Sequence, residues 1–178
     1  MNLFEVIEKR RSIRKFKPDP VAKNHLKKIL EAGRLAPSGD NRQPWYFIVV
    51  KDSETKNALS IAANNQKFIA DADLVIVALG DPRVYPESDL ATNSILHKQD
   101  PMIAIEHIVL AATAFGYGTC WIGAFNEEEV KTILRIPESV AVIALLPVGV
   151  SDESPPPRPR KAFREVFFKE SYGIPLEF

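Results

Sequence analysis

Apolar and polar residues follow two patterns along the chain, and each pattern predicts one type of element. Compact apolar runs bounded by polar or turn-forming residues are typical of strands, whereas apolar residues three or four positions apart are typical of helices. The apolar runs predict strands at residues 45–50, 73–79, 118–122 and 139–150. Helical spacing and helix-starting residues predict helices near residues 2–9, 21–33, 53–63, 101–115 and from 126 onward. Residues 81–99 are polar and irregular, which predicts a loop with a helical turn.

The interleaved order of these elements predicts an α+β fold, with a central mixed β-sheet of four strands flanked by helices on both faces. Strand 73–79 is apolar throughout, which is typical of a central strand that is covered on both faces. No internal repeat is present, and the 178 residues fit a single domain that spans residues 1–178.

Two further apolar segments need a surface that covers them. The helix at 101–115 is apolar around most of its circumference, which predicts burial on every side, either at the centre of one domain or in a dimer interface. The C-terminal segment 162–178 is rich in aromatic residues. Either the flank of the same domain or a partner subunit would cover this segment, as in arm exchange.

Composition excludes several classes of protein. The 23 Lys and Arg residues balance 23 Asp and Glu residues, whereas a generic cationic nucleic-acid-binding protein is strongly basic. The single cysteine, Cys120, excludes an intramolecular disulfide, and the three histidines lack the spacing of metal ligands, so no metal is expected. The N-terminus carries acids where a signal peptide is positively charged, and the longest apolar stretch is shorter than the ~20 residues of a membrane span. We therefore expect a soluble, cytoplasmic protein with neither membrane nor nucleic-acid partners.

Basic residues are nevertheless concentrated in two short clusters. Six of the 23 lie at residues 9–17, and four lie at residues 158–164 among prolines. Planar guanidinium groups on restricted backbone suit bidentate phosphate binding, and Ser12 adds a hydroxyl donor. A solvated charged surface is the alternative interpretation. A nucleic-acid site would need interleaved aromatic residues for stacking, and only Phe16 and Phe163 qualify.

The loop at residues 37–45 is a second candidate. It carries two amides, a hydroxyl and a glycine between two prolines, in the order Pro-Ser-Gly-Asp-Asn-Arg-Gln-Pro-Trp. Side-chain amides can read the mixed donor and acceptor edge of a heteroaromatic ring. The alternative is a simple connection between a helix and a strand.

Four segments resemble, in order, the signatures of one family. Residues 10–16, Arg-Arg-Ser-Ile-Arg-Lys-Phe, resemble the Arg-Arg-Ser-x-Arg-x-Phe signature of the FMN-dependent nitroreductase family. Residues 36–45 and 116–125 resemble its second and third signatures. Residues 146–150, followed by 158–161, resemble its closing block. The resemblance covers nearly the whole chain apart from residues 81–99.

The resemblance implies a homodimer with two FMN sites at the subunit interface. Position in the motifs implies that the phosphate and ribityl chain are held by Arg10, Ser12, Arg158 and Arg160, with Arg11 beside them. It places Arg14 near the N1/O2 edge of the flavin.

The same resemblance implies contacts around the flavin ring. The other subunit would contribute Pro37, Ser38, Gly39 and Asn41. Asn65 or Gln66 would contact the pyrimidine ring, and Ile122 and Gly123 would lie by N5, with the backbone N–H of Gly123 facing it. Two positions depart from better known members: Ile122 replaces a frequent acidic residue, and His107 replaces a frequent Gln or Asn.

The implied activity is that of a flavoprotein oxidoreductase. FMN would take a hydride from NADH or NADPH and reduce an electrophilic acceptor, such as a nitroaromatic compound or a quinone, by a ping-pong mechanism. A cation at the N1/O2 edge would stabilise the developing negative charge, so no side chain is assigned as a nucleophile or acid–base catalyst. The alternatives are a relative that catalyses dehalogenation or flavin breakdown, and a flavin-binding module without turnover.

Overall fold

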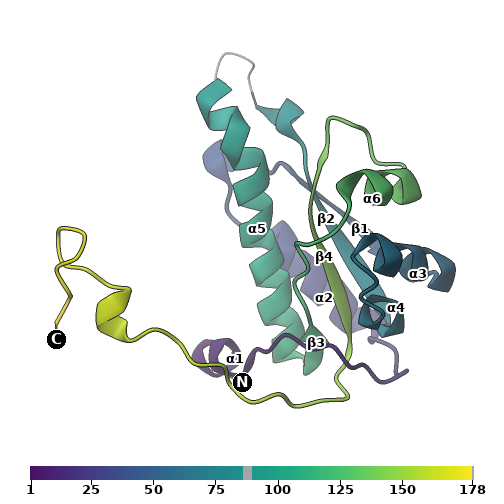
Figure 1. The fold of residues 1–178 in the computed structure, drawn as a ribbon, viewed down its shortest axis with the longest axis horizontal. Coiled ribbons are helices and arrows are strands. Elements are labelled where there is room, and N and C mark those ends of the chain that lie inside the picture. The colour runs from purple at the N-terminus through teal and green to yellow at the C-terminus, as the bar shows by residue number, and fades with distance from the viewer. Residues whose placement is uncertain (86–89, 178) are drawn as a thin grey trace.

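The chain folds around one antiparallel sheet with helices on both of its faces (Figure 1). The computed structural model describes residues 1–85 and 90–177, with the side chains of residues 90–94 left aside. The strands are β1 (Trp45–Val50), β2 (Leu74–Gly80), β3 (Tyr117–Thr119) and β4 (Ala141–Val150). The helices are α1 (Leu3–Lys9), α2 (Lys23–Arg34), α3 (Ser53–Ala62), α4 (Phe68–Asp71), α5 (Leu90–Ala114) and α6 (Glu127–Leu134). Short 3-10 helices lie at η1 (Gly39–Asn41), η2 (Pro82–Val84) and η3 (Phe163–Glu165).

The sheet has the strand order β1-β2-β4-β3. All three strand pairs are antiparallel, so the mixed sheet expected from the sequence is wrong. Parallel pairing among the described residues is an isolated bridge between Ser12 and Thr119. Every residue of β2 is buried, which confirms the central place expected for this apolar strand. The α+β class and the four strands are confirmed.

Alternate residues of β2 face two different cores. Leu74 and Ile76 pack in a cluster with Ile29 of α2 and Ile108 of α5. Val75, Val77 and Leu79 point to the opposite face, into a cluster that includes residues of α3, α4 and α6. Because side chains alternate along a strand, one continuous apolar run supplies both cores, and the expected helical layers on both faces are confirmed.

Helix α5 begins earlier than the sequence predicts. A helix was expected from Pro101, with a loop at 81–99, but α5 begins at Leu90 and Pro101 lies inside it. Proline removes the N–H that would bond to the carbonyl of the residue four positions earlier, here His97. That carbonyl packs against Gly80, where an added Cβ would lie only 1.9 Å from its oxygen. Helix α5 thus continues through Pro101, with the carbonyl of His97 lying against Gly80 of β2.

Burial of α5 on every side is also wrong within one chain. Ile105 and Ile108 are fully buried, but Met102 and Ile103 are 43% and 41% exposed. Leu3, Phe4 and Ile7 of α1 are exposed as well. The apolar character of α5 thus exceeds what its own chain covers.

The C-terminal segment leaves the body of the chain after β4 and extends away from it (Figure 1). Phe163 and Phe167 stack at 4.3 Å, yet both remain about half exposed. Tyr172 is 94% exposed. The flank of the same domain therefore does not cover this segment, which leaves a partner as the interpretation that would bury it. Among the helices in the described part of the chain, none is both long and apolar enough to cross a membrane.

Candidate functional site

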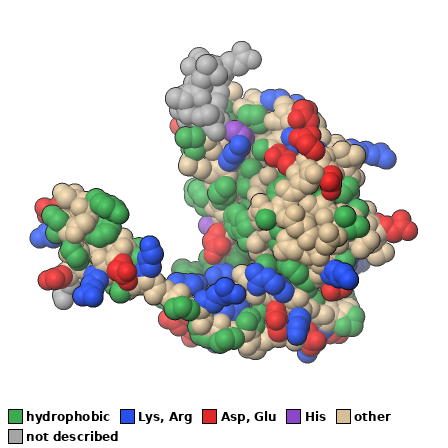
Figure 2. Space-filling model, viewed as in Figure 1, with side chains coloured by type: hydrophobic (Ala, Val, Ile, Leu, Met, Phe, Trp, Pro, Cys, Tyr) green, Lys and Arg blue, Asp and Glu red, His purple; other side chains and the backbone are tan. Residues whose placement is uncertain are grey.

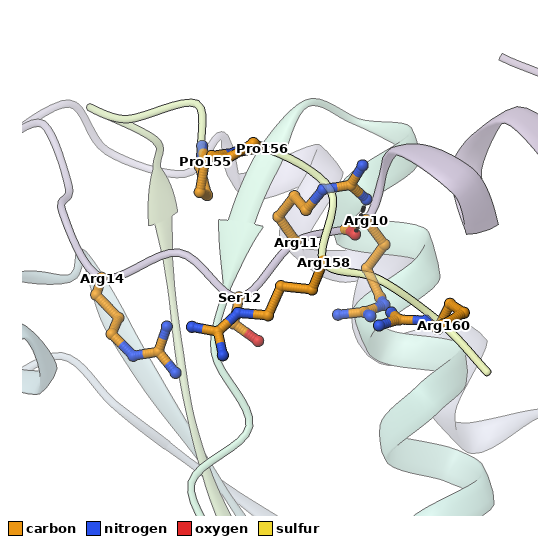
Figure 3. A pocket seen from close by; sticks show the side chains of 8 residues that line it. All are labelled: Arg10, Arg11, Ser12, Arg14, Pro155, Pro156, Arg158 and Arg160. Atoms are coloured by element: carbon orange, nitrogen blue, oxygen red, sulfur yellow. Dashed lines mark hydrogen bonds between the residues drawn. The ribbon is translucent and has the colours of Figure 1, made fainter.

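The two basic clusters meet at one cavity of about 250 Å³, between the segment after α1 and the segment after β4 (Figure 3). Figure 2 shows Lys and Arg side chains gathered at the base of the body, beside the departing tail. The lining residues are Arg10, Arg11, Ser12, Arg14, Pro155, Pro156, Arg158 and Arg160. The sequence singled out all of these except the two prolines, although it did place the basic residues at 158–164 among prolines.

Backbone pairing fixes the segment that carries Ser12 and Arg14. The N–H of Ile13 donates to the carbonyl of Thr119 at 2.8 Å, and the side chain of Ile13 is buried. In this extended segment the neighbours of Ile13 point to the opposite side, into the cavity. Gly118 permits the close approach, since an added Cβ there would lie 2.8 Å from the Cβ of Ile13. One buried isoleucine thus orients two polar neighbours.

A second set of bonds brings residues 153–160 to the same place. The N–H of Asp152 donates to the carbonyl of Lys15 at 2.9 Å, and the N–H of Arg14 donates to the carboxylate of Glu153. Four of the next six residues are prolines, whose fixed φ angles restrict the backbone. Arg158 consequently points toward Ser12, while the guanidinium groups of Arg10 and Arg160 lie beside each other (Figure 3).

The cavity holds an excess of positive charge. Among the described residues, the guanidinium groups of Arg10, Arg14, Arg158 and Arg160 form no ion pair with a carboxylate. Arg11 differs, because it donates to the carbonyls of Glu8 and Arg10. Glu106 lies near Arg10; burial raises the pKa of Glu106, and the charge of Arg10 opposes that shift.

Guanidinium groups donate up to five N–H bonds each and accept none, so this donor set matches a phosphate. The residues therefore fit the phosphate end of FMN.

Arg14 stands apart from the other arginines that line the cavity (Figure 3). Its guanidinium carbon lies 5.9 Å from the ring centroid of Phe68, the first residue of α4. Asn65 and Gln66 come just before Lys67, the N-cap of this helix, and the side-chain amide of Gln66 donates to the carbonyl of Ala63 at 2.9 Å. Asn65 has a left-handed backbone with φ of 58°. Arg14 thus lies close to the start of α4, shortly after Asn65 and Gln66 in the chain.

The thiol of Cys120 lies behind Ser12 and Arg14. Burial raises the pKa of this thiol, while the charge of Arg14 and a hydrogen bond with Ser12 act in the opposite direction. The residue Cys120 is only 3% exposed. A neutral, buried thiol is a packing residue.

Ile122 and Gly123 have different surroundings. The backbone of Ile122 exchanges two hydrogen bonds with Leu145, at 3.0 and 3.1 Å, and its side chain is buried in the core. Gly123 is exposed, and the nearest atom to an added Cβ would be Nε1 of Trp121 at 3.9 Å. Of the two, Gly123 is the residue with an accessible backbone.

The loop at 37–41 does not line the arginine cavity of its own chain. Among the described residues, the lining of that cavity includes none of Pro37, Ser38, Gly39 and Asn41. The hydroxyl of Ser38 accepts a bond from the N–H of Gln43 at 2.9 Å. The N–H of Gly39 donates to the carboxylate of Asp100 at 3.0 Å, an anchor that sequence reasoning missed. A single chain therefore presents these two parts of the predicted site separately.

Comparisons with known proteins show the family of the chain. The sequence model of the Nitroreductase family matches residues 7–97 and 58–150. An NADH dehydrogenase from Thermus thermophilus is 31% identical over 186 residues, covering 89% of this chain and 91% of the relative.

Two solved structures share the fold. A nitroreductase family protein from Clostridium novyi is 37% identical, with a TM-score of 0.80 over 98% of this chain and 97% of that one. The NADPH:FMN oxidoreductase from Vibrio harveyi, solved in complex with NAD+, is 28% identical, with a TM-score of 0.86 over 97% of this chain and 78% of that one. Sequence, fold and the order of the motifs thus lead to one conclusion: the chain belongs to the nitroreductase family of oxidoreductases.

Proposed function

We propose that the protein is an FMN-dependent NAD(P)H oxidoreductase of the nitroreductase type, acting in the cytoplasm, where NADH and NADPH are supplied. The observation that carries this proposal is the cavity around Ser12, where four guanidinium groups without carboxylate partners among the described residues face one space. Exposed cations without partners contribute little to stability, so a bound anion is the simplest reason to gather them. The name of the Vibrio harveyi relative, an NADPH:FMN oxidoreductase, supports FMN as that anion.

The residues divide into a phosphate side and a ring side. Arg10, Ser12, Arg158 and Arg160 hold the phosphate and the ribityl chain, with Arg11 fixing the backbone between them through its bonds to Glu8 and Arg10. Bidentate guanidinium contacts favour phosphate over a singly charged anion.

On the ring side, Arg14 supplies a fixed positive charge. FMN held here would supply hydride chemistry, with NADH or NADPH as the donor in one half-reaction and a nitroaromatic compound or a quinone as the electrophilic acceptor in the other. The charge of Arg14 would stabilise the negative charge of a reduced flavin, and Asn65, Gln66 and Gly123 would orient the ring through amide and backbone groups. No other side chain needs to act as a nucleophile or acid–base catalyst.

The working unit that we propose is a homodimer. Residues 37–41 lie away from the arginine cavity of their own chain, so the partner subunit would supply them to each site. Exposed apolar residues on α1, on α5 and along the C-terminal segment provide surface for this association, among them Phe4, Met102 and Phe167. Association would bury these side chains and so remove from water the apolar surface that one chain leaves exposed.

Anaerobic reduction tests the proposed function. Protein saturated with FMN and freed of unbound flavin is expected to remain yellow, to lose its yellow absorbance when NADH or NADPH is added, and to regain it with nitroaromatic compounds or quinones. A chain that takes up no FMN contradicts the proposal. A chain that binds FMN but is not reduced by either coenzyme is a flavin-binding module instead, and products of dehalogenation or of a cleaved flavin would identify a different reaction at the same site.

A further inference from the structure

A buried carboxylate links three segments of the chain next to the 37–41 loop. Asp100 lies within α5 and is 4% exposed. One of its oxygens, Oδ2, accepts a hydrogen bond from the N–H of Gly39 at 3.0 Å and another from the hydroxyl of Tyr85 at 2.7 Å. Tyr85 is itself 8% exposed and follows η2. Asp100 therefore joins the central helix to the predicted cofactor loop and to the segment that follows β2.

The bonds of Asp100 are those of an anchor. In the described part of the chain, no Lys or Arg forms an ion pair with this carboxylate. A buried carboxylate without a cation depends on hydrogen-bond donors, and two donors among the described residues come from the loop and from Tyr85. Burial and the bond to Asp100 both raise the pKa of the Tyr85 hydroxyl, so this group remains protonated and keeps donating.

The loop needs such an anchor because its backbone is strained. Asp40, Asn41 and Gln43 all have left-handed φ angles, of 49°, 55° and 53°. A left-handed φ angle costs free energy for a residue other than glycine. Such a residue keeps this conformation only when the surrounding structure imposes it. Gly39 lies close to α5, since an added Cβ would be 3.0 Å from Cδ1 of Leu96. The hydrogen bond from the N–H of Gly39 to the carboxylate of Asp100 links this loop to a side chain of α5.

We propose that Asp100 is a positioning residue that holds the 37–41 loop in its cofactor-binding conformation and so acts on the FMN site of the partner subunit. This inference rests on the proposed function, because it takes FMN as the ligand and the homodimer as the unit. Asp100 does not touch the cofactor. Its loss frees the strained loop, which must then be ordered again each time FMN binds, and the cost is seen in affinity.

Three variants separate positioning from general stability. Asp100→Ala removes both bonds and is expected to weaken FMN binding about tenfold in an equilibrium titration. Asp100→Asn keeps an oxygen that can accept both bonds and is expected to bind FMN nearly as the parent does. Asp52→Ala is the matched control, because Oδ2 of Asp52 also accepts one backbone N–H and one hydroxyl, both from Thr55, but at the start of α3. It is expected to lower the melting temperature without changing FMN affinity.

Mixed dimers test whether Asp100 acts across the interface. When one subunit carries Asp100→Ala and the other carries Arg160→Ala, one site combines an intact cavity with an intact loop. One tight FMN site per dimer is therefore expected. When both substitutions lie in the same subunit opposite an unchanged partner, each site has one defect, and no tight site is expected. The reverse pattern means that the loop serves its own chain, and overturns the proposal.

The remaining outcomes are also decisive. Unchanged FMN affinity in Asp100→Ala, or equal losses in Asp100→Ala and Asp52→Ala, overturns the positioning role. If Asp100→Ala does not fold, Tyr85→Phe replaces it, with an expected loss of about threefold from one missing hydrogen bond, and an unchanged affinity again overturns the proposal. Failure of the unchanged protein to bind FMN at all contradicts the proposed function instead, so the two failures are distinguishable.

Discussion

Charged groups are used in opposite ways in two regions of the molecule. Around the cavity, the side chains of Arg10, Arg14, Arg158 and Arg160 are exposed or half-buried, and none forms an ion pair with a carboxylate of the described residues. Near the carboxyl end of β2, the carboxylates of Asp81 and Asp100 are almost fully buried, at 3% and 4% exposure, and both accept two or more hydrogen bonds.

The difference follows from the cost of burying charge. A buried carboxylate must have its donors within the fold, because an unpaired one would destabilise the protein strongly. Exposed guanidinium groups are stabilised by water and remain available to bind a ligand. The carboxylate region therefore maintains the fold and the 37–41 loop, while the arginine region is available for binding. Substitutions in the two regions are expected to change different quantities.

The largest expected effect is on FMN affinity. The double substitution Arg158→Ala and Arg160→Ala removes two charged donors from the cavity and is expected to weaken FMN binding by at least about 100-fold, with an unchanged melting temperature. Fluorescence titration of the apoprotein measures the affinity. Lys161→Ala is the control, because Lys161 is an exposed neighbouring cation that does not line the cavity. Equal losses in both proteins would mean that general positive charge, and not this cavity, attracts the cofactor.

A second substitution separates the ring side from the phosphate side. Arg14→Ala is expected to slow flavin reduction by NADH or NADPH about 10- to 100-fold, because the developing negative charge loses its fixed cation. Its FMN affinity is expected to change by less than about threefold. Arg160→Ala is expected to show the reverse, with weak FMN retention and a nearly normal rate of reduction once saturated. Anaerobic stopped-flow measurements on saturated proteins test this, and equal effects on both quantities would refute the division of roles.

The smallest effect is expected in the carboxylate region and depends on pH. Hydrogen bonds from Arg83, the closest at 2.6 Å, lower the pKa of Asp81 below its ordinary value. The folded protein thus favours the ionised form, so this stabilisation is complete above the pKa of the unfolded chain and is lost as pH falls below about 4.

Asp81→Asn is therefore expected to lower the melting temperature by about 3 °C near neutral pH and to leave FMN affinity unchanged. The difference from the parent is expected to shrink below about pH 4. Scanning calorimetry across pH measures it, with Asp19→Asn as the control because Asp19 is exposed. A constant difference at every pH would show that the charge of Asp81 does not stabilise the fold.

Much of the fold and half of the candidate site could be predicted because the signals are local. The unbroken apolar run of residues 73–79 identified a central strand, which the structure confirms, and the concentration of basic residues at 9–17 and 158–164 marked the two segments that line the cavity. Residues 10–14 and 155–160 are far apart in the sequence, and only the family resemblance indicated that they lie together in the structure.

The errors arose where distant contacts decide the local structure. Pro101 is a favourable first helical position on its own, but the carbonyl of His97 faces Gly80, and α5 continues through it. Met102 and Ile103 look like core residues by composition, yet one chain leaves them exposed. Asp100 gave no signal, because an aspartate in a polar stretch becomes an anchor only when Gly39 and Tyr85 reach it.

The measurement that tests the central claim most directly compares FMN with riboflavin, which lacks the phosphate, in equilibrium titrations of the apoprotein. If Arg10, Arg158 and Arg160 form a phosphate site, FMN binds at least about 100-fold more tightly than riboflavin, and this preference disappears in the Arg158→Ala and Arg160→Ala double variant. Equal affinities for the two flavins in the unchanged protein would contradict the account.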